Sequence, residues 1–171
     1  DRKQLVQIGW YIRYYRAVYQ APVPPWVSKV HLAQDKPFIA KAQRRTDLHS
    51  PYRNRAEHGN VEVVSWLDND AYDDLLSSSV IFLELFDASA NNAIIEAIAR
   101  NTPVVVNRHP AVEEYLGKDY PLYFDTIDDV EKLMDLSLIR AAHDHISAID
   151  KSEFSIDRFV ERINNFVAAL A

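Results

Sequence analysis

The sequence has no cysteine and only three glycines among its 171 residues. Without cysteine, the chain cannot form the disulfide framework of a small secreted domain or use a thiolate in catalysis. Gly9, Gly59 and Gly117 are too few and too widely spaced for a Gly-x-Gly-x-x-Gly dinucleotide loop or a Walker phosphate loop. A Gly-x-Ser-x-Gly element is also missing, so a serine hydrolase lacks its usual nucleophile turn.

Long apolar runs and an excess of positive charge are absent as well. No stretch approaches the ~20 residues needed to span a bilayer, and no signal peptide opens the chain. The net charge of -6 argues against a general nucleic-acid binder. We expect a cytoplasmic protein, with peripheral attachment to a membrane left open. Because the sequence starts at Asp1 without a methionine, we also expect a domain excised from a longer protein.

The residues that are present suit a single globular domain. Hydrophobic residues make up 48% of the chain and charged residues 26%. A chain of this length buries roughly 70% of its unfolded surface, so we expect one domain over residues 1–171. Short apolar runs alternate with helical patterns, which predicts an α/β fold: a Rossmann-like parallel sheet of about six strands with helices on both faces. The expected strands cover residues 5–8, 27–33, 60–67, 80–86, 102–107 and 121–124.

Helical patterns fill most of the remaining chain. The expected helices cover residues 36–45, 68–78, 93–101, 126–136, 137–148 and 155–170. Asp68 stands where it can cap the second of them. The last carries a clear apolar stripe, which predicts core packing. The stripe consists of Phe159, Ile163, Phe166, Val167 and Leu170.

The most informative stretch covers residues 80–123. Its apolar runs VIFLELF and TPVVVN enclose the helical pattern AIIEAIARN, which is the signature of a βαβ unit in a parallel sheet. Such units bind ligands at the carboxyl ends of their strands. The turn before the helix contains Ser89, Asn91 and Asn92, which can cap it, and helix N-termini bind phosphate through free NH groups. Glu96, one turn into the helix, can accept hydrogen bonds from ribose hydroxyls; a solvated glutamate is the alternative.

Residues 87–107, DASANNAIIEAIARNTPVVVN, resemble the nucleotide-sugar-binding half of the two-domain GT-B glycosyltransferases, in particular the retaining group-1 type family. The resemblance is specific over about residues 61–124. In that family two acids separated by seven residues open this helix; the first contacts the donor sugar and the second the ribose. Glu96 matches the second acid. The first falls on Ala88, with Asp87 one place early, so the chain departs from the family pattern there.

The resemblance implies further donor-site residues. The first strand of this half ends in a glycine loop, followed by a basic residue that reaches the donor phosphates. In this chain these are Gly9 and Arg13, with Arg16 as the weaker candidate. The other implied contacts are Ser65, Trp66 and Leu67 at the nucleotide base and Glu114, in the sequence EYLG, as a structural support of the donor pocket.

Several of these side chains also have simpler explanations. Trp66 can be a core residue rather than a stacking wall for the base, and Arg13 and Arg16 can be surface residues. Arg108 follows the expected strand at 102–107 at its carboxyl end, where it could reach phosphate, and His109 could reach the sugar. The simpler explanation, that each is a loop residue without a role, is favoured for both.

Charged clusters elsewhere are less specific. Five cations gather in an otherwise acidic chain: Lys41, Arg44, Arg45, Arg53 and Arg55. They could cover phosphates or an anionic acceptor, although such runs are more often solvated surface. Two groups of possible metal ligands have the wrong spacing for a metal site: Asp68, Asp70, Asp73 and Asp74, and His143 with His145. We therefore expect no metal and no cofactor other than the donor substrate.

The sequence thus predicts the donor-binding half of a glycosyltransferase, which moves a hexose from a nucleoside diphosphate sugar to an acceptor hydroxyl. Asp87 and Arg108 are included among its donor contacts, and no catalytic residue is identified. The acceptor, a glycan, lipid or protein, would bind an N-terminal domain absent from this chain. Two rivals remain open. One is a non-catalytic Rossmann-like nucleotide-binding or interaction module, and the other is a small epimerase with His109 as its base.

Overall fold

The computed structural model describes residues 3–33, 41, 45, 48, 50–51, 54–88 and 91–170. Six strands within them form one all-parallel sheet in the order β3-β2-β1-β4-β5-β6. These strands are β1 (Lys3–Gln7), β2 (Val27–Leu32), β3 (Val61–Val64), β4 (Val80–Leu83), β5 (Val104–Asn107) and β6 (Tyr123–Phe124). The predicted α/β fold with a six-stranded Rossmann-like sheet is therefore confirmed.

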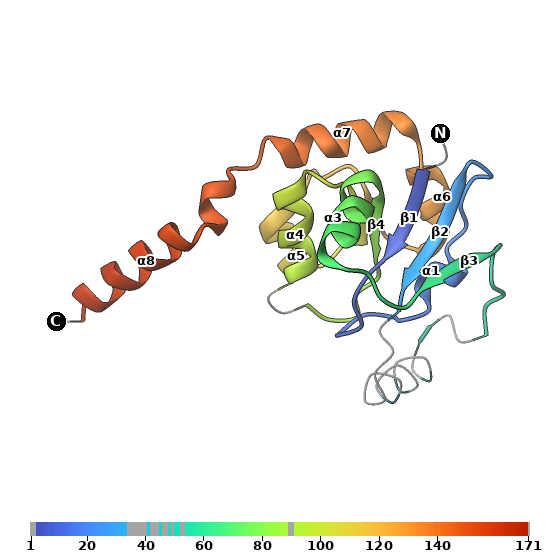
Figure 1. Cartoon of the computed structure of the whole chain (residues 1–171), viewed down its shortest axis with the longest axis horizontal. Coiled ribbons are helices and arrows are strands. Elements are labelled where there is room, and N and C mark those ends of the chain that lie inside the picture. The colour runs from blue at the N-terminus through green and yellow to red at the C-terminus, as the bar shows by residue number, and fades with distance from the viewer. Residues whose placement is uncertain are drawn as a thin grey trace.

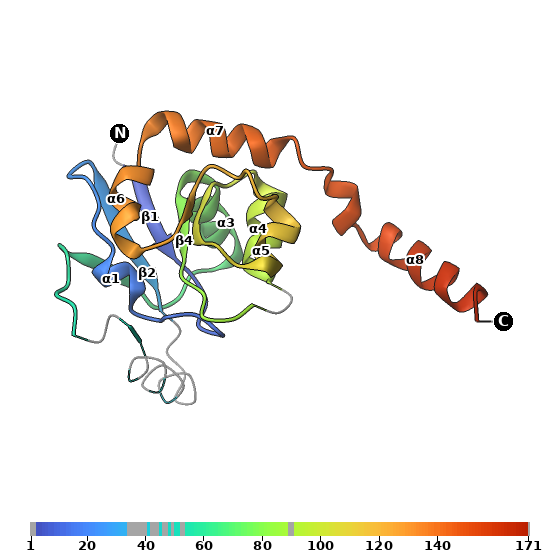
Figure 2. The ribbon, with the colours of Figure 1, turned by 180° about the vertical axis from the view of Figure 1, so that it is seen from behind.

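Helices connect and follow these strands. They are α1 (Ala17–Gln20), α3 (Asn69–Ser78), α4 (Asn92–Arg100), α5 (Pro110–Leu116), α6 (Val130–Leu133), α7 (Leu136–Ser147) and α8 (Ile156–Ala168), with 3-10 turns η1 (Ile127–Asp129) and η2 (Lys151–Phe154). Helix α3 contacts α4 on the face toward the viewer in Figure 1, and α1 lies on the opposite face, which Figure 2 brings forward. Both faces of the sheet are thus covered, as parallel sheets require.

Strands β4 and β5 form the centre of the core. All four residues of β4 and the three valines of β5 are buried. Phe82 on β4 stacks against Phe124 on β6, with ring centroids 5.8 Å apart. Strand β3 lies at the edge of the sheet, and its Val63 is exposed. The continuous apolar runs of the sequence therefore belong to the strands that neighbours cover on both sides.

Local signals placed most helix boundaries correctly. Asp68 caps α3 by accepting a hydrogen bond from the Ala71 amide at 2.8 Å. The predicted helix over 126–136 is wrong as a single element: Thr126 and Asp129 form a capping box around η1, and the short α6 follows. The predicted helix over 36–45 lies largely outside the described residues.

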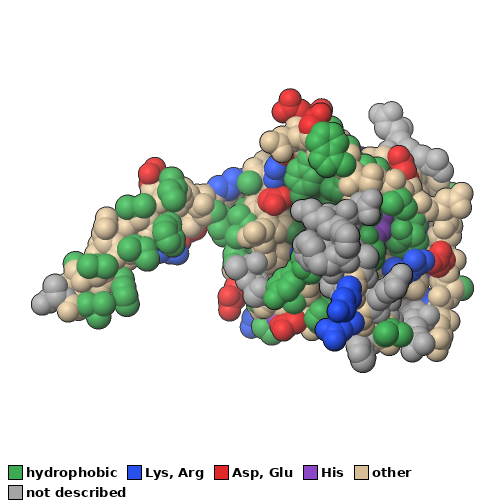
Figure 3. All heavy atoms as spheres, turned by 60° about the horizontal axis from the view of Figure 1, so that its bottom comes forward, with side chains coloured by type: hydrophobic (Ala, Val, Ile, Leu, Met, Phe, Trp, Pro, Cys, Tyr) green, Lys and Arg blue, Asp and Glu red, His purple; other side chains and the backbone are tan. Residues whose placement is uncertain are grey.

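The predicted core packing of the last helix is wrong. No residue of α8 is buried, and the five side chains of its apolar stripe expose between 46% and 73% of their surface. Figure 1 shows α8 extending away from the body of the molecule, and Figure 3 shows hydrophobic side chains over its surface. The amphipathic pattern identified the helix, but it contained no information on whether the chain folds back onto its own core.

His31 on β2 is a buried histidine within the part of the molecule around α1. Its Nδ1 lies 3.1 Å from the hydroxyl of Tyr19, and its ring meets the edge of Tyr15 with centroids 4.3 Å apart. Its Nε2 is buried without a hydrogen-bond partner among the described residues. Burial, with a smaller contribution from Arg16, lowers the pKa of His31 to about 4.

His31 should therefore make the fold sensitive to mild acid. Between pH 6.5 and pH 4 the unfolded chain binds a proton at His31 and the folded chain does not, so the free energy of unfolding falls as the pH falls. We expect a loss of roughly 2–3 kcal/mol from this group. Urea unfolding of the wild type and His31→Asn at both pH values measures it. An equal loss of unfolding free energy in the wild type and in His31→Asn would show that His31 is not the group responsible, because the other titrating groups are common to both proteins.

Because the core is buried and α8 is exposed, shortening an isoleucine side chain should have different effects on stability in the two places. Ile98 on α4 is fully buried, so Ile98→Ala should lower the free energy of unfolding by about 2–5 kcal/mol. Ile163 on α8 is exposed, so Ile163→Ala should change it by less than about 0.5 kcal/mol in dilute solution. Denaturant titrations of the two variants provide the comparison, and similar losses would show that α8 packs on the body.

Candidate functional site

A pocket opens at the carboxyl end of β1, beside its neighbour β4. Strand β2 lies on one side of the β1–β4 pair and β5 on the other. The connection after β1 and the connection after β4 therefore run in opposite directions and leave a crevice between them. The pocket has a volume of about 280 Å³. Its walls come from the loop after β1, from α3 and from the first turns of α4. Four residues predicted for the donor site line it together: Gly9, Arg13, Asn92 and Glu96.

Arg13 supplies the positive charge of this pocket. The residue is only 8% exposed, and its guanidinium donates from Nη1 to the Ile8 carbonyl at 2.7 Å and from Nε to the Tyr11 carbonyl at 3.2 Å. Burial lowers the pKa of Arg13 to about 10, and nearby Tyr72 and Glu96 act in the opposite direction. Arg13 therefore stays charged at neutral pH. Its Nη2 has no partner in the described part of the chain, so it can still donate to a ligand.

Gly9 creates the space that Arg13 occupies. Its φ is +71°, and a Cβ added there would lie 2.8 Å from Nη1 of Arg13. Beyond it, the loop is tied to the end of β4: Arg13 forms an antiparallel bridge with Leu85, and the Tyr14 amide donates to the Glu84 carbonyl at 2.9 Å. This pairing explains why the predicted strand over 80–86 ends early. It also holds Arg13 between the ends of β1 and β4, the point where the strand order of the sheet reverses and which is called the switch point below.

Glu96 stands across the pocket on α4. One oxygen, Oε2, accepts a hydrogen bond from the Tyr72 hydroxyl at 2.8 Å and lies 4.0 Å from the Arg100 guanidinium. Arg100 also forms an ion pair with Asp73. Burial and the bond to Glu96 raise the pKa of Tyr72, so Tyr72 remains a protonated donor. The other oxygen of Glu96, Oε1, has no hydrogen-bond partner among the described residues and can accept from a ligand.

The N-terminus of α4 adds donors at the same wall. Asn92 and Ala93 line the pocket in the first turn of α4, where amide groups have no intrahelical partner. Asn91 occupies the N-cap position but makes no capping bond; it is 5% exposed, and neither polar atom of its side chain has a partner among the described residues. An unpaired buried amide costs about 1–3 kcal/mol, and without a capping bond from Asn91 the first amides of α4 remain open to a polar partner. Ser89 lies outside the described residues.

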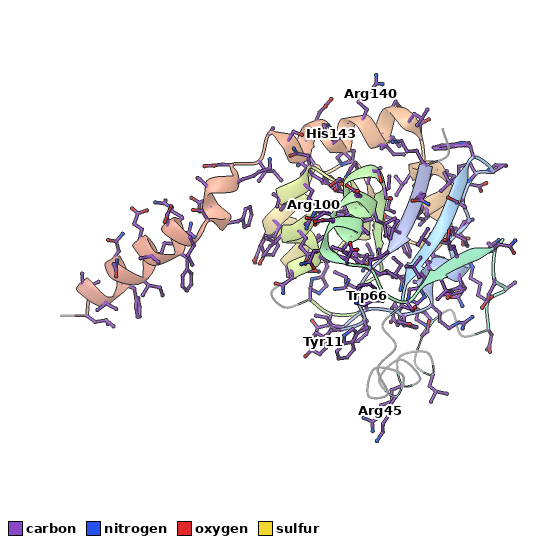
Figure 4. All side chains as sticks on the ribbon, viewed as in Figure 1. Tyr11, Arg45, Trp66, Arg100, Arg140 and His143 are labelled. Carbon is purple, nitrogen blue, oxygen red and sulfur yellow. The ribbon has the colours of Figure 1, made fainter. Side chains whose placement is uncertain are left out.

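Aromatic side chains border the pocket. Trp10 and Tyr11 line it and meet edge to face, with ring centroids 5.7 Å apart; Tyr11 is 61% exposed. Trp66 is 77% exposed, so it is not the core residue that was its alternative explanation. Figure 4 shows Tyr11 and Trp66 at the same end of the sheet, although Trp66 does not line the pocket. Sequence reasoning missed Tyr72, Trp10 and Tyr11; the aromatic pair directly after Gly9 was the available signal.

Other predicted donor contacts lie outside this pocket. Arg108 is held at the end of β5, with Glu113 at 3.4 Å and Asp125 at 3.7 Å from its guanidinium, which lies over the Tyr123 ring. Asp87 is exposed and accepts a hydrogen bond from the Ala88 amide at 2.8 Å. Its carboxylate lies 4.0 Å from Nε2 of His109.

The remaining candidates are also separate from the pocket. Arg16 forms an ion pair with Glu57 and lies over the Tyr19 ring, so Arg13 is the arginine that the fold brings to the pocket. Leu67 is half-buried and outside the lining. Exposed Glu114, on α5, lines a different groove of about 560 Å³ near the start of α8.

The described residues contain no cluster of three or more side chains that could hold a metal. In the same part of the chain, no helix has the length and apolar character needed to cross a membrane. A comparison of the chain with protein-family models and with curated proteins gave no match. The function is therefore argued from the pocket itself.

Gly9 and Gly59 form a matched pair for testing the pocket. Both have positive φ, but a Cβ at Gly59 would meet nothing within 4 Å, whereas at Gly9 it would meet the Arg13 guanidinium. We expect Gly9→Ala and Gly59→Ala each to lose about 1 kcal/mol of stability from backbone strain. Only Gly9→Ala should also weaken the binding of pyrophosphate, measured by calorimetry, because it displaces Arg13. Equal binding by the two variants would contradict the role of Arg13.

Proposed function

We propose that this pocket binds the nucleoside diphosphate of a nucleotide sugar, and that the chain is the donor-binding half of a glycosyltransferase. The observation that carries the proposal is the convergence of Gly9, Arg13, Asn92 and Glu96 on one pocket at the switch point of the sheet. These residues come from two distant parts of the sequence. The sequence predicts all four as contacts of one donor site: Asn92 from its place before the helix, and Gly9, Arg13 and Glu96 with the support of the resemblance to the GT-B family.

The diphosphate lies between Arg13 and the N-terminus of α4. The guanidinium supplies a full positive charge, and the amides of Asn92 and Ala93 supply hydrogen-bond donors with the favourable end of the helix dipole. Charge-assisted hydrogen bonds of this kind contribute about 1.5–3 kcal/mol each. The same groups stabilise the diphosphate as it leaves the sugar, which lowers the barrier to transfer.

The ribose lies against Glu96. Its Oε1 accepts hydrogen bonds from the ribose hydroxyls, while the Tyr72 hydroxyl keeps the carboxylate oriented through Oε2. A volume of about 280 Å³ is just below the usual range for ligand sites, so it suits a diphosphate and ribose with the base outside. The rings of Trp10 and Tyr11 offer apolar surface for that base at the border of the pocket.

The reaction would transfer a hexose: the bond from its anomeric carbon to the diphosphate breaks, and a bond to the acceptor hydroxyl forms. In the family that the sequence resembles, the acceptor binds mainly the other domain. We therefore expect this chain alone to bind the donor and to transfer sugar poorly or not at all.

One observation favours a second candidate, a non-catalytic nucleotide-binding module. Glu96 is the only carboxylate among the described residues that line the pocket, and exposed Asp87 does not replace the missing sugar-contacting acid at Ala88. Such a module would bind nucleoside diphosphates with and without the hexose equally well. A glycosyltransferase half should discriminate between hexose conjugates of the same nucleotide.

A calorimetric titration with UDP, GDP and their hexose conjugates tests both candidates. We expect saturable binding of one nucleotide, and Glu96→Gln should weaken it by about 1–3 kcal/mol, because it replaces a charged acceptor by a neutral one. Arg13→Lys should have a similar effect, because an ammonium group cannot reproduce the guanidinium geometry.

Glu131→Gln is the matched control, since Glu131 is exposed on α6 and outside the pocket. This variant should bind like the wild type. Binding that Glu96→Gln and Arg13→Lys leave unchanged would show that the nucleotide occupies another site. Failure of all the nucleotides to bind would overturn the proposed function.

A further inference from the structure

Helix α8 carries an apolar surface that nothing in the described part of the chain covers. This surface, called the α8 stripe here, consists of Ile156, Phe159, Val160, Ile163, Phe166 and Val167 on α8 and of Leu170, two residues beyond the end of the helix. All seven side chains are exposed, by 46% to 73%. Their spacing repeats every seven residues: the steps of three, one and three residues from 156 to 163 recur from 163 to 170. A repeat of seven keeps side chains on one side of a helix. Most of the stability of a helix in a protein comes from packing such a face, and large exposed apolar patches mark interaction sites.

The base of α8 is fixed on the body. Phe154 in η2 stacks against Tyr115 on α5, with ring centroids 6.0 Å apart. Glu153 pairs with Arg158 at 3.2 Å and also with Arg162, which ties η2 to the first turns of α8. The helix therefore leaves the body in a defined direction, and Figure 1 shows it standing clear of the sheet and its helices. A partner can approach it without displacing any described element.

The area of the stripe suits a protein partner. The two phenylalanines have surfaces of about 150–250 Å² each and the five aliphatic side chains somewhat less, so the seven together expose on the order of 700 Å². One partner contributes about the same area to a standard protein interface. The polar side of α8 carries two acids, Asp157 and Glu161, and two arginines, Arg158 and Arg162. Helices that lie on membranes are rich in Lys and Arg on that side, so this charge pattern disfavours a lipid surface.

The order of large and small side chains suggests what the partner is. We propose that α8 pairs with α8 of a second copy of this chain, antiparallel and centred on Ile163. That arrangement places Phe159 opposite Val167 and Val160 opposite Phe166 of the other helix, so that each large ring faces a small side chain. Such alternation allows facing layers to interdigitate. A parallel pair would instead oppose phenylalanine to phenylalanine and leave valine against valine.

Charge placement agrees with the antiparallel arrangement. The four charged residues of α8 lie before its centre, and Ile163 to Leu170 contain none. In the antiparallel pair, each charged half therefore faces an uncharged half, and no like charges are opposed. The two bodies lie at opposite ends of the pair, because each is attached to the N-terminus of its own α8.

Sedimentation velocity and light scattering over a range of protein concentrations test the pairing. We expect a concentration-dependent dimer. Ile163→Glu should convert it to a monomer at every concentration used, because two buried carboxylates would meet at the centre. Asn164→Glu is the matched control: it adds the same charge to the polar side of α8 and should leave the dimer intact. Since α8 is exposed, the melting temperature of each variant's body should match that of the wild type.

Engineered cysteines determine the orientation, because the chain has none of its own. In the antiparallel pair, Ile156→Cys of one copy lies opposite Leu170→Cys of the other. An oxidised mixture of the two variants should form disulfide-linked heterodimers, whereas each variant alone should not crosslink efficiently. Crosslinking of each variant with itself would show a parallel pair and overturn the proposal.

Two other outcomes would also overturn it. A wild-type chain that stays monomeric, or a dimer that Ile163→Glu does not affect, would exclude the stripe as the contact between copies. A monomer that co-sediments with phosphatidylcholine–phosphatidylserine vesicles through the stripe would show that a lipid surface covers it instead.

Discussion

The reversal of strand order between β1 and β4 is the constraint on which the candidate site depends. All six strands run in the same direction, so their carboxyl ends share one edge of the sheet. The connections after β1 and β4 must leave that edge toward opposite sides, and the pocket lies where they separate. The pairing of Arg13 with Leu85 closes part of this gap with backbone hydrogen bonds. It also places Arg13 in the wall of the pocket, where it is the one arginine among the described lining residues.

The electrostatics of the pocket follow from that arrangement. Arg13 is nearly buried, and its hydrogen bonds within the described part of the chain are to neutral carbonyl groups, which satisfy donors without cancelling the charge. Burial lowers its pKa to about 10, a measure of the cost of keeping a cation there. The amides at the start of α4 add positive potential on the other side of the pocket. The Arg13 guanidinium and these amides together favour the binding of an anion. Oε1 of Glu96 can accept hydrogen bonds from hydroxyl groups of the same ligand.

The proposed pairing through α8 and the proposed nucleotide site use different parts of the fold. The pocket lies at the carboxyl end of β1. Helix α8 begins after η2, beside a different groove that residues of α4 and α5 line. Loss of one function by mutation should therefore leave the other measurable. The two also differ in origin, since the pocket is built from several elements and the α8 stripe from one continuous helix.

Properties that depend on neighbouring residues in the chain could be predicted from the sequence. The apolar runs and the helical repeats determined the elements, and their alternation determined the parallel sheet. The side chain of Asp68 determined the start of α3, because a cap acts within one turn. The types of residue expected at the site, with Arg13 and Glu96 foremost, followed from the resemblance and from the order of the elements.

Burial and contact between distant segments were decided by the tertiary structure. The stripe on α8 and Trp66 have the composition of core residues, yet they are exposed, because the direction of the chain after η2 and after β3 is not a local property. The hydrogen bond from Tyr72 to Glu96 joins α3 to α4, and the space for Arg13 depends on the missing Cβ of Gly9. The sequence by itself determined the elements and the chemistry available. Only the packing of the sheet decided which side chains meet, because it brings together residues that no short-range pattern connects.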